Sequence, residues 1–470
     1  MKFFSVTIDP PTATSNHTMR AALPFLFTLF TAACGANSEM AQPIYPSTLP
    51  PAPRNASAEA PVRATGRFTE ADLRAQRERG PAGLDALMAA YRTATPAERR
   101  DLEDAVDQVA AQRDASAAGL YWYTNLDEAK RVADEAKKPI LSLRLLGALT
   151  DEYSCANSRF FRAVLYPHPE VNARMRGYVL HWSTERPAPI ATIDFRDGRR
   201  VVRTVTGNSV HYVLDANGRP IEAMPGLVGP TAFARWLDES AGLHASLAGA
   251  PEQRAAVLGA HHRSVVARSQ RTFASETRAV GVPGTWPAPA LASYGARAMA
   301  GPSGGKGKNS DPSAYAAMPV APSKAAVERP MVQALVPEEP PPLVETVAWS
   351  SLAPLHLDAG LADPAIRAFL RRKNPLDWTD PSRPVPLDDA QFEAMLGRFT
   401  LSVAEDTAKN ELALRAVTAQ WLARGNLGFT QLNGLVYSTL FLTPESDPWL
   451  GLVPPRVFTG LANDGVVVAR

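Results

Sequence analysis

The chain of 470 residues is long enough for about three domains of ordinary size. Its 42 prolines are nearly twice the usual share of about 5%, which indicates long spacers, whereas a hydrophobic content of 45% is normal for globular protein and requires a packed core. A net charge of +2 argues against nucleic acid as the main partner, and two cysteines exclude a disulfide scaffold, a cysteine-ligated zinc module and a four-cysteine iron–sulfur centre.

The chain begins with features typical of an exported lipoprotein. Residues 21–33 form an apolar run without a charge, too short to span a membrane but suited to a signal peptide. We expect translation to begin at Met19, just before this run. The sequence TAACG at 31–35 resembles the lipobox of bacterial lipoproteins, in which the signal is cut before the cysteine and its thiol receives a diacylglycerol. The resemblance implies lipidation of Cys34. An ordinary secretory signal with an incidental cysteine is the alternative.

Composition and hydrophobic periodicity divide the chain into segments. In chain order these are a signal peptide at 1–34, a disordered tether at 35–66, a helical extension at 67–118, an α/β block at 119–246, a helix at 247–279, a disordered Pro/Gly-rich linker at 280–345 and a mainly helical region at 346–470. The proline-rich segments hold too few apolar residues to order themselves. The C-terminal region either docks on the α/β block or forms a small domain of its own.

Local signals place several helix starts. Thr69 begins a helix, and Thr95 to Glu98 form a capping box with proline at the first helical position. Asn125 begins a helix in the α/β block, and Asp388 or Asp389 begins one in the C-terminal region.

The central block alternates helix and strand. The expected elements are a strand at 140–146, helices at 156–165 and 169–176, a strand at 178–182, a hairpin at 193–205 turning at Asp197-Gly198, a hairpin at 210–224 turning at Asn217-Gly218 and a helix at 231–240. This alternation predicts an α/β sandwich.

The block resembles a known family, the thioredoxin-like superfamily in its exported bacterial form. The resemblance covers about a quarter of the chain and rests on the order of elements and on three stretches: WYTNLDEAKRVADEAKKPILSLRLLG, SCANSRFFRAVLYPHPEVNARMRGYVLHW and HYVLDANGRPIEAMPGL. In that family two cysteines open the second helix as C-x-x-C, and a cis-proline faces them. The resemblance places Cys155 at the first cysteine, Ser158 at the second and Ser209 at the cis-proline position, which makes a C-x-x-S variant.

Cys155 is therefore the candidate catalytic residue. A thiol at a helix N-terminus lies at the positive end of the helix dipole, which favours the thiolate. Arg159 and Arg162 would strengthen this effect, and the acidic residues at 151–152 would oppose it. Without a second cysteine a mixed disulfide is not resolved within the motif, which leaves disulfide exchange or trapping of a client thiol. In that chemistry Ser158 would donate a hydrogen bond to the thiolate.

Two hypotheses for the function follow. In the first, a membrane-anchored protein of the bacterial cell envelope, on the periplasmic side or in the outer membrane, acts on envelope protein clients through Cys155, as a thiol–disulfide oxidoreductase or isomerase-like enzyme would. In the second, it is a non-catalytic binding or scaffold lipoprotein with a degenerate thioredoxin fold. Neither hypothesis includes a cofactor, a metal ion or nucleic acid. A sulfur buried under side chains would favour the second.

Histidines are the remaining candidates for site residues. We expect His181 and His211 to be core residues, because they lie on predicted central strands. His261 and His262 lie next to each other on a predicted helix, and adjacent helical residues do not share a face. We therefore expect these two on a solvated surface.

Overall fold

The computed structural model describes residues 63–204, 208–249, 251–282, 284–287, 349–377, 379–380, 383–425, 427–441, 443 and 450. The predicted signal peptide with Cys34, all but the end of the predicted tether and nearly all of the predicted linker lie outside the described residues. The described residues all belong to one compact unit, Pro51–Val467. Within them, no helix has the length and apolar character needed to cross a membrane.

Three helices precede the sheet. They are α1 (Glu70–Glu78), α2 (Pro81–Thr93) and α3 (Pro96–Ala110). The predicted caps are confirmed, because Thr69 and Thr95 each form a capping box with the residue three positions on. Buried Arg77 of α1 connects these helices to one another and to the segment that follows them. Its guanidinium donates hydrogen bonds to the carbonyl oxygens of Val109 in α3 (2.7 Å) and Trp122 (2.8 Å).

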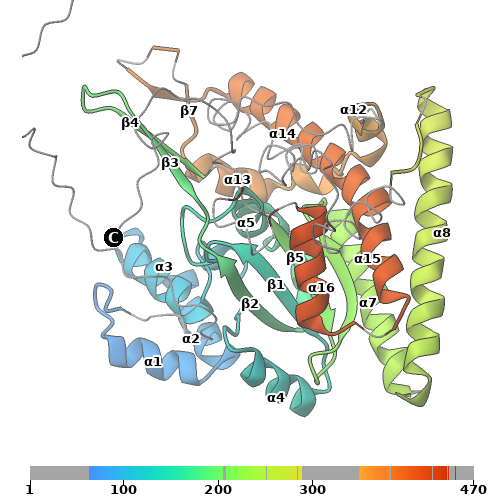
Figure 1. Cartoon of the computed structure of the whole chain (residues 1–470). Coiled ribbons are helices and arrows are strands. Elements are labelled where there is room, and N and C mark those ends of the chain that lie inside the picture. Colours follow the sequence, from blue (N-terminus) through green and yellow to red (C-terminus); the bar gives the residue numbers. More distant parts are fainter. Residues whose placement is uncertain are drawn as a thin grey trace, which may run out of the picture. The chain divides into compact units, whose positions relative to one another are not determined.

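A four-stranded mixed sheet forms the centre of the fold (Figure 1). Its strands are β1 (Ile140–Leu146), β2 (Val179–Arg186), β5 (Ser209–Leu214) and β6 (Pro220–Pro225), in the order β2-β1-β5-β6. β1 runs parallel to β2, with Ile140 opposite Val179, and antiparallel to β5, with Ile140 opposite Leu214. Every residue of β5 and β6 is buried, so both faces of this part of the sheet are covered.

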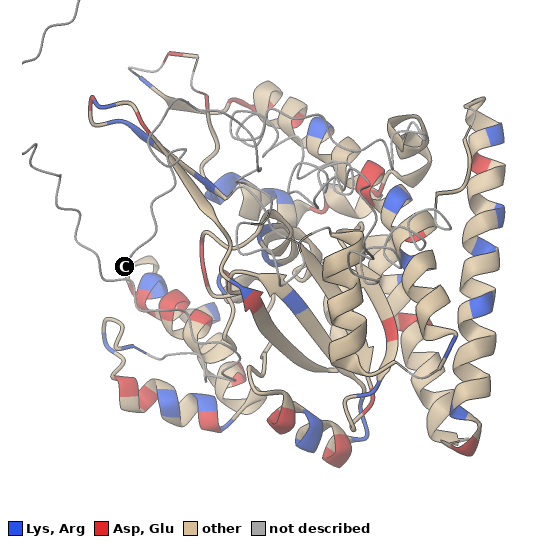
Figure 2. Ribbon diagram, in the orientation of Figure 1, with Lys and Arg blue, Asp and Glu red and all other residues tan. Residues whose placement is uncertain are grey.

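Helices surround this sheet. They are α4 (Leu126–Ala136), α5 (Ala156–Phe160), α6 (Pro169–Met175), α7 (Pro230–Gly249) and α8 (Arg254–Val280). The predicted α/β class is confirmed, and so is the Asn125 cap of α4, whose side chain accepts hydrogen bonds from the amides of Asp127 and Glu128. Figure 2 shows acidic and basic residues side by side on α1 and α4, where they form exposed ion pairs such as Lys130–Asp127.

Both predicted hairpins are present. β5 and β6 flank the Asn217-Gly218 turn, while β3 (Ile190–Asp194) and β4 (Arg200–Thr204) flank Asp197-Gly198 and form a two-stranded ribbon outside the main sheet. Both turn glycines have positive φ, as tight hairpin turns require. In Figure 1 the β3–β4 ribbon projects away from the sheet, and Phe195 near its tip is 51% exposed.

Some element boundaries differ from the prediction. The helix expected over 156–165 is α5 followed by a π-helical turn, Phe161–Leu165. β2 continues to Arg186, beyond the predicted end at 182, because its backbone still pairs with the end of β1 after the apolar run has stopped. The helix expected over 231–240 extends to Gly249. Hydrophobic periodicity detects side-chain burial, whereas backbone pairing persists through polar residues such as these.

The described C-terminal part is mainly helical, as predicted. It contains α12 (Trp349–Leu352), α13 (Pro364–Arg372), α14 (Asp389–Lys409), α15 (Arg415–Leu422) and α16 (Phe429–Leu435), π-helical turns at Asn410–Leu414 and Val436–Leu440, and the short strands β7 (Leu376–Asp377) and β8 (Val385–Pro386). Asp388 caps α14, which was one of the two residues expected to do so.

This C-terminal part docks on the α/β core, which is one of the two arrangements expected. The side-chain amide of Asn410 donates to the carbonyl of Leu227 (2.6 Å), and the backbone amide of Gly229 donates to the hydroxyl of Thr407 (2.8 Å). The hydroxyl of Tyr212 on β5 lies 3.1 Å from the side-chain oxygen of Asn433 on α16. The two parts also share apolar clusters, so they are packed together rather than merely adjacent.

Candidate functional site

Cys155 lies at the N-cap of α5, where the prediction placed a helix start. Its exposed fraction is 0%, and it belongs to an apolar cluster with Phe160, Phe161 and Tyr166. α5 continues directly into the π-helical turn, so the helix behind the thiol runs from Ala156 to Leu165. The candidate thiol is therefore a core side chain.

Ser158 and Ser154 form the inner part of the same turn, and both are fully buried. The Ser158 hydroxyl is hydrogen-bonded to the Ser154 hydroxyl and lies 3.0 Å from the backbone carbonyl oxygen of Cys155. A serine hydroxyl three residues along a helix often bonds back to a carbonyl in this way. These contacts stabilise the first turn of α5.

The structure brings this turn together with Ser209. Ser209 is the first residue of β5 and is fully buried. The side-chain amide of Asn157, between Cys155 and Ser158, donates to the hydroxyl of Ser209 at 3.0 Å. The segment 155–158 and position 209 are far apart in the chain but adjacent in the fold.

The two arginines after Cys155 hold the loop before it. Arg159 donates to the carbonyl oxygen of Ser154 (2.9 Å) and to the hydroxyl of Thr204 (3.1 Å). Arg162 is 1% exposed and donates to the carbonyl oxygen of Asp151 (2.9 Å). Burial lowers the pKa of Arg162, which the nearby carboxylates of the 107–152 region partly oppose. Both guanidinium groups donate hydrogen bonds to backbone carbonyl oxygens of this loop. These bonds replace the hydrogen bonds to water that burial removes.

Residues from the C-terminal part pack against the segments around Cys155. Phe399 on α14 packs against Phe160, with ring centroids 5.8 Å apart, and Val403 belongs to the same apolar cluster as Cys155. The hydroxyl of Tyr437 donates to the carbonyl oxygen of Asn208 (3.1 Å), next to Ser209. Burial raises the pKa of Tyr437 well above its usual value, and the nearby groups that add to this include Cys155.

His181 and His211 are core residues, as predicted. Each is 1% exposed, and burial lowers the pKa of each to about 3. The ring of His181 is hydrogen-bonded to the hydroxyl of Ser142 on the neighbouring strand (2.9 Å). The ring of His211 is hydrogen-bonded to the hydroxyl of Tyr166 (2.8 Å), beside Cys155.

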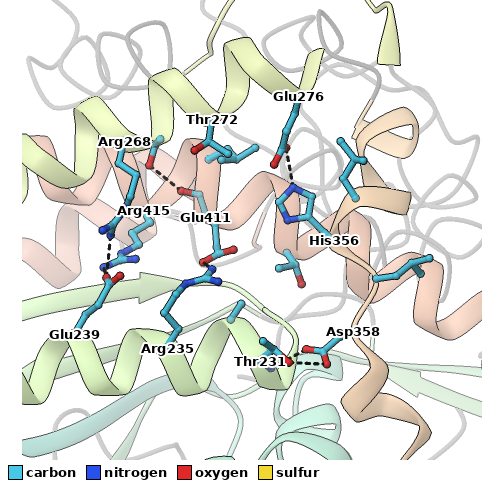
Figure 3. A pocket seen from close by; sticks show the side chains of 16 residues that line it. Thr231, Arg235, Glu239, Arg268, Thr272, Glu276, His356, Asp358, Glu411 and Arg415 are labelled. Atoms are coloured by element: carbon cyan, nitrogen blue, oxygen red, sulfur yellow. Dashed lines mark hydrogen bonds and ion pairs between the residues drawn. The ribbon is translucent and has the colours of Figure 1, made fainter. Parts of the chain in front are cut away.

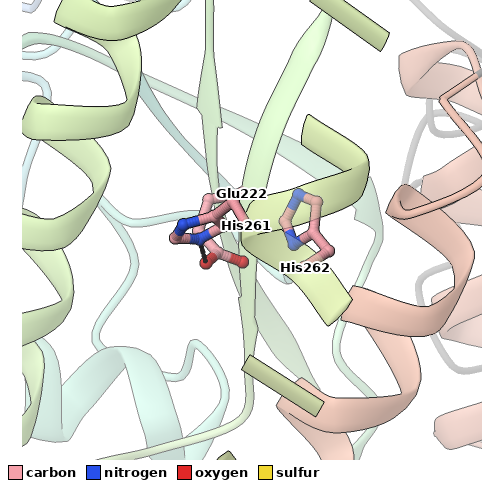
Figure 4. Close-up of side chains that lie close together, drawn as sticks. All are labelled: Glu222, His261 and His262. Atoms are coloured by element: carbon pink, nitrogen blue, oxygen red, sulfur yellow. Dashed lines mark hydrogen bonds and ion pairs between the residues drawn. The ribbon is translucent and has the colours of Figure 1, made fainter. Parts of the chain in front are cut away.

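The expectation for His261 and His262 was wrong. His262 is fully buried and the side chain of His261 is only 22% exposed, because α8 packs against β6 on one side and α15 on another. A helix covered on two sides can bury adjacent residues. His261 Nε2 lies 3.2 Å from Glu222 Oε2, and His262 Nε2 lies 3.0 Å from the carbonyl oxygen of Ile221 (Figure 4). Among the described residues, Glu222, His261 and His262 form a group with metal-ligating atoms within 4.8 Å of one another.

An open pocket of about 510 Å³ lies between α7, α8 and the C-terminal part (Figure 3). Its lining is charged, and oppositely charged side chains face one another across it. The ion pairs are Arg235–Glu411 (2.5 Å), Arg268–Glu239 (2.9 Å) and Arg415–Glu239 (2.8 Å), and His356 Nε2 lies 2.8 Å from Glu276 Oε2. Because the charges of these pairs neutralise one another, we describe the pocket as a polar interface. Its ion pairs hold the C-terminal part against α7 and α8.

Sequence patterns could not have predicted this polar interface or the group formed by Glu222, His261 and His262. The lining of the pocket is drawn from Thr231 to Arg415, so no local spacing records it. The His261-His262 pair was visible as a local feature, but its acidic partner lies on a strand some forty residues earlier.

Comparisons with protein-family models, with curated proteins and with solved structures found no match to this chain. Its function is therefore inferred from the chemistry of its own residues.

Proposed function

We propose that this chain is a non-catalytic binding or scaffold lipoprotein of the bacterial cell envelope, built on a thioredoxin-like core. The observation that carries the proposal is the burial of Cys155, whose exposed fraction is 0% at the position of the family's nucleophile. A thiol must be ionised and reachable to attack a disulfide, and apolar surroundings disfavour its thiolate.

The order of elements supports the thioredoxin-like assignment of the core. A strand, helices and a parallel strand (β1, α5, α6 and β2) are followed by the β5–β6 hairpin and α7, in one mixed sheet. The contact between Asn157 and Ser209 is also in keeping with the resemblance, since the family's motif faces its cis-proline across the same gap. The β3–β4 ribbon is an addition between β2 and β5.

The covering of the thiol supports a scaffold role over disulfide exchange. Cys155 lies in an apolar cluster that contains Val403 of the C-terminal part and against which Phe399 packs, so a client disulfide could reach the thiol only if this cluster opened. The chain has one other cysteine, Cys34, which the lipobox resemblance assigns to the lipid anchor. The core then serves as a rigid platform on which the N-terminal helices and the C-terminal part are held.

The test is alkylation of Cys155 in the full chain carrying Cys34→Ser, so that a single thiol is measured. We expect maleimide labelling of the folded protein to be at least about 100-fold slower than labelling in denaturing urea, because a fully buried thiol reacts only when the fold opens. Combining Ser158→Cys with Cys155→Ser moves the single thiol to a second buried position on the same turn and provides a matched control.

Rapid labelling of the folded protein, with an inflection below the ordinary cysteine pKa of about 8.5, would reject the scaffold proposal in favour of disulfide exchange. The anchor is tested separately: wild-type protein should fractionate with membranes and the Cys34→Ser variant should not. A variant that stays in the membrane fraction would refute lipidation at this cysteine.

A further inference from the structure

Three side chains with metal-ligating atoms meet where α8 lies against β6 (Figure 4). Glu222 projects from β6, and His261 and His262 are consecutive on α8. We propose that Glu222, His261 and His262 form a binding site for a divalent transition-metal ion, with Zn²⁺ as the ion that this ligand set favours. Two imidazoles and one carboxylate are a common three-ligand set for zinc, with the fourth position left to water.

The first pair of ligand atoms already has a suitable separation. Glu222 Oε2 and His261 Nε2 lie 3.2 Å apart. In a tetrahedral zinc site with bonds of about 2.0–2.1 Å, two ligand atoms are roughly 3.3 Å apart. An ion can therefore replace the proton shared by this pair while the two side chains hardly move.

The second histidine is oriented as a ligand would be. His262 Nε2 lies 3.0 Å from the carbonyl oxygen of Ile221, which can only accept, so Nε2 carries the proton and Nδ1 keeps a free lone pair. Metal-bound histidines usually donate their other ring N–H to a carbonyl or carboxylate in this way. His262 is fully buried, and its Nδ1 has no hydrogen-bond partner within the described part of the chain. A buried nitrogen without a partner requires an explanation, and an ion shared with Glu222 and His261 supplies one.

The carboxylate is fixed and its surroundings are close to neutral. Glu222 Oε1 accepts the backbone amide of Ala223 (3.0 Å), and Oε2 accepts Arg415 (2.8 Å). Arg415 also bonds to Glu239 (2.8 Å), which in turn pairs with Arg268. Glu222 and Glu239 together balance the charges of Arg415 and Arg268, so an ion at Glu222 Oε2 must share that oxygen with Arg415. Such outer contacts orient a ligating carboxylate.

The site is reachable from solvent. Glu222 and His262 are fully buried, whereas 22% of the His261 side chain is exposed. An ion and its water ligand can enter along that side.

The proposal is tested by titrating Zn²⁺ into the chelator-treated full chain by calorimetry. The chain carries Cys34→Ser and a tag without histidine, so that neither the Cys34 thiol nor a tag binds the ion; the remaining thiol, Cys155, is buried. We expect one ion per chain, and at least about 100-fold weaker binding by His261→Ala and by Glu222→Gln. His244→Ala, which removes a half-buried histidine of α7 outside the group, should bind like the parent chain.

Co²⁺ gives a second readout, because a tetrahedral nitrogen–oxygen site produces visible absorption bands that His261→Ala should abolish. If Glu222→Gln fails to fold by circular dichroism, the partly exposed His261→Ala variant still decides. Failure of the folded parent chain to bind Zn²⁺, or unchanged binding by His261→Ala, would overturn the proposal. Neither result bears on the reactivity of Cys155.

Discussion

Replacing Arg415 by methionine should destabilise the protein strongly. Arg415 is 4% exposed and bonds to Glu222, which is fully buried on β6, and to Glu239 on α7, each at 2.8 Å. Burial alone would raise the pKa of Glu222, but the guanidinium of Arg415 beside it instead holds that pKa well below its usual range. In the variant this carboxylate loses its main counter-charge inside the fold.

The expected loss in the free energy of unfolding is about 3–5 kcal/mol, the usual effect of removing one partner of a buried ion pair. Urea unfolding followed by circular dichroism at pH 7 measures it. Adding Glu222→Gln to Arg415→Met should recover part of the loss, since the uncompensated charge is then gone. Arg199→Met is the matched control: its pair with Asp197 is exposed, so the change should be below about 1 kcal/mol.

An Arg415→Met variant within about 1 kcal/mol of the wild type would refute this account. So would strict additivity with Glu222→Gln, because it would mean that the two side chains do not interact in the folded protein.

The remaining predictions concern the loss of stability at acid pH and the effect of replacing two glycines of positive φ by alanine. His181 and His211 have a pKa of about 3 when folded against 6.5 when unfolded, so the unfolded state gains protons first and stability falls as the pH drops from 6.5 toward 3. At pH 5 each histidine is expected to lower the free energy of unfolding by about 2 kcal/mol, which urea unfolding at pH 7 and pH 5 would measure. The same urea midpoint at both pH values would contradict this prediction. Gly226→Ala should lose more than about 2 kcal/mol, because φ is +78° and a Cβ would lie 2.5 Å from the Asn410 side chain. Gly198→Ala, with positive φ but open space, should lose less, and equal losses would exclude the Asn410 contact as the cause.

Local chemistry in the sequence predicted much of the core. The capping box at Thr95 and the Asn217-Gly218 turn act over a few residues, and both are present. The strand at 140–146 was equally clear, because five of its seven residues are Ile or Leu, as a strand covered on both faces requires.

The candidate site was only partly predictable, because its environment is made by distant segments. The pattern placed Cys155 at a helix start, and that is where it lies. It lies in an apolar cluster that draws residues from distant segments, including Val403 of the C-terminal part, and no local motif records that packing. The burial of His262 was not predictable for the same reason. It depends on a hydrogen bond to the carbonyl oxygen of Ile221 on β6 and on the packing of α15 against α8.

The docking of the C-terminal part has a consequence for how the protein matures. Val280 ends α8 and Trp349 begins α12, so the contacts over Cys155 close a long loop, and each doubling of such a loop costs only about 0.6 kcal/mol. Chains fold from the N-terminus as they emerge, so the sheet and α5 can assemble before residues 399 and 437 arrive. During that interval the apolar cluster around Cys155 lacks Phe399 and Val403, and docking then adds them. The C-terminal part thus completes the apolar cluster around a cysteine that is buried in the finished protein.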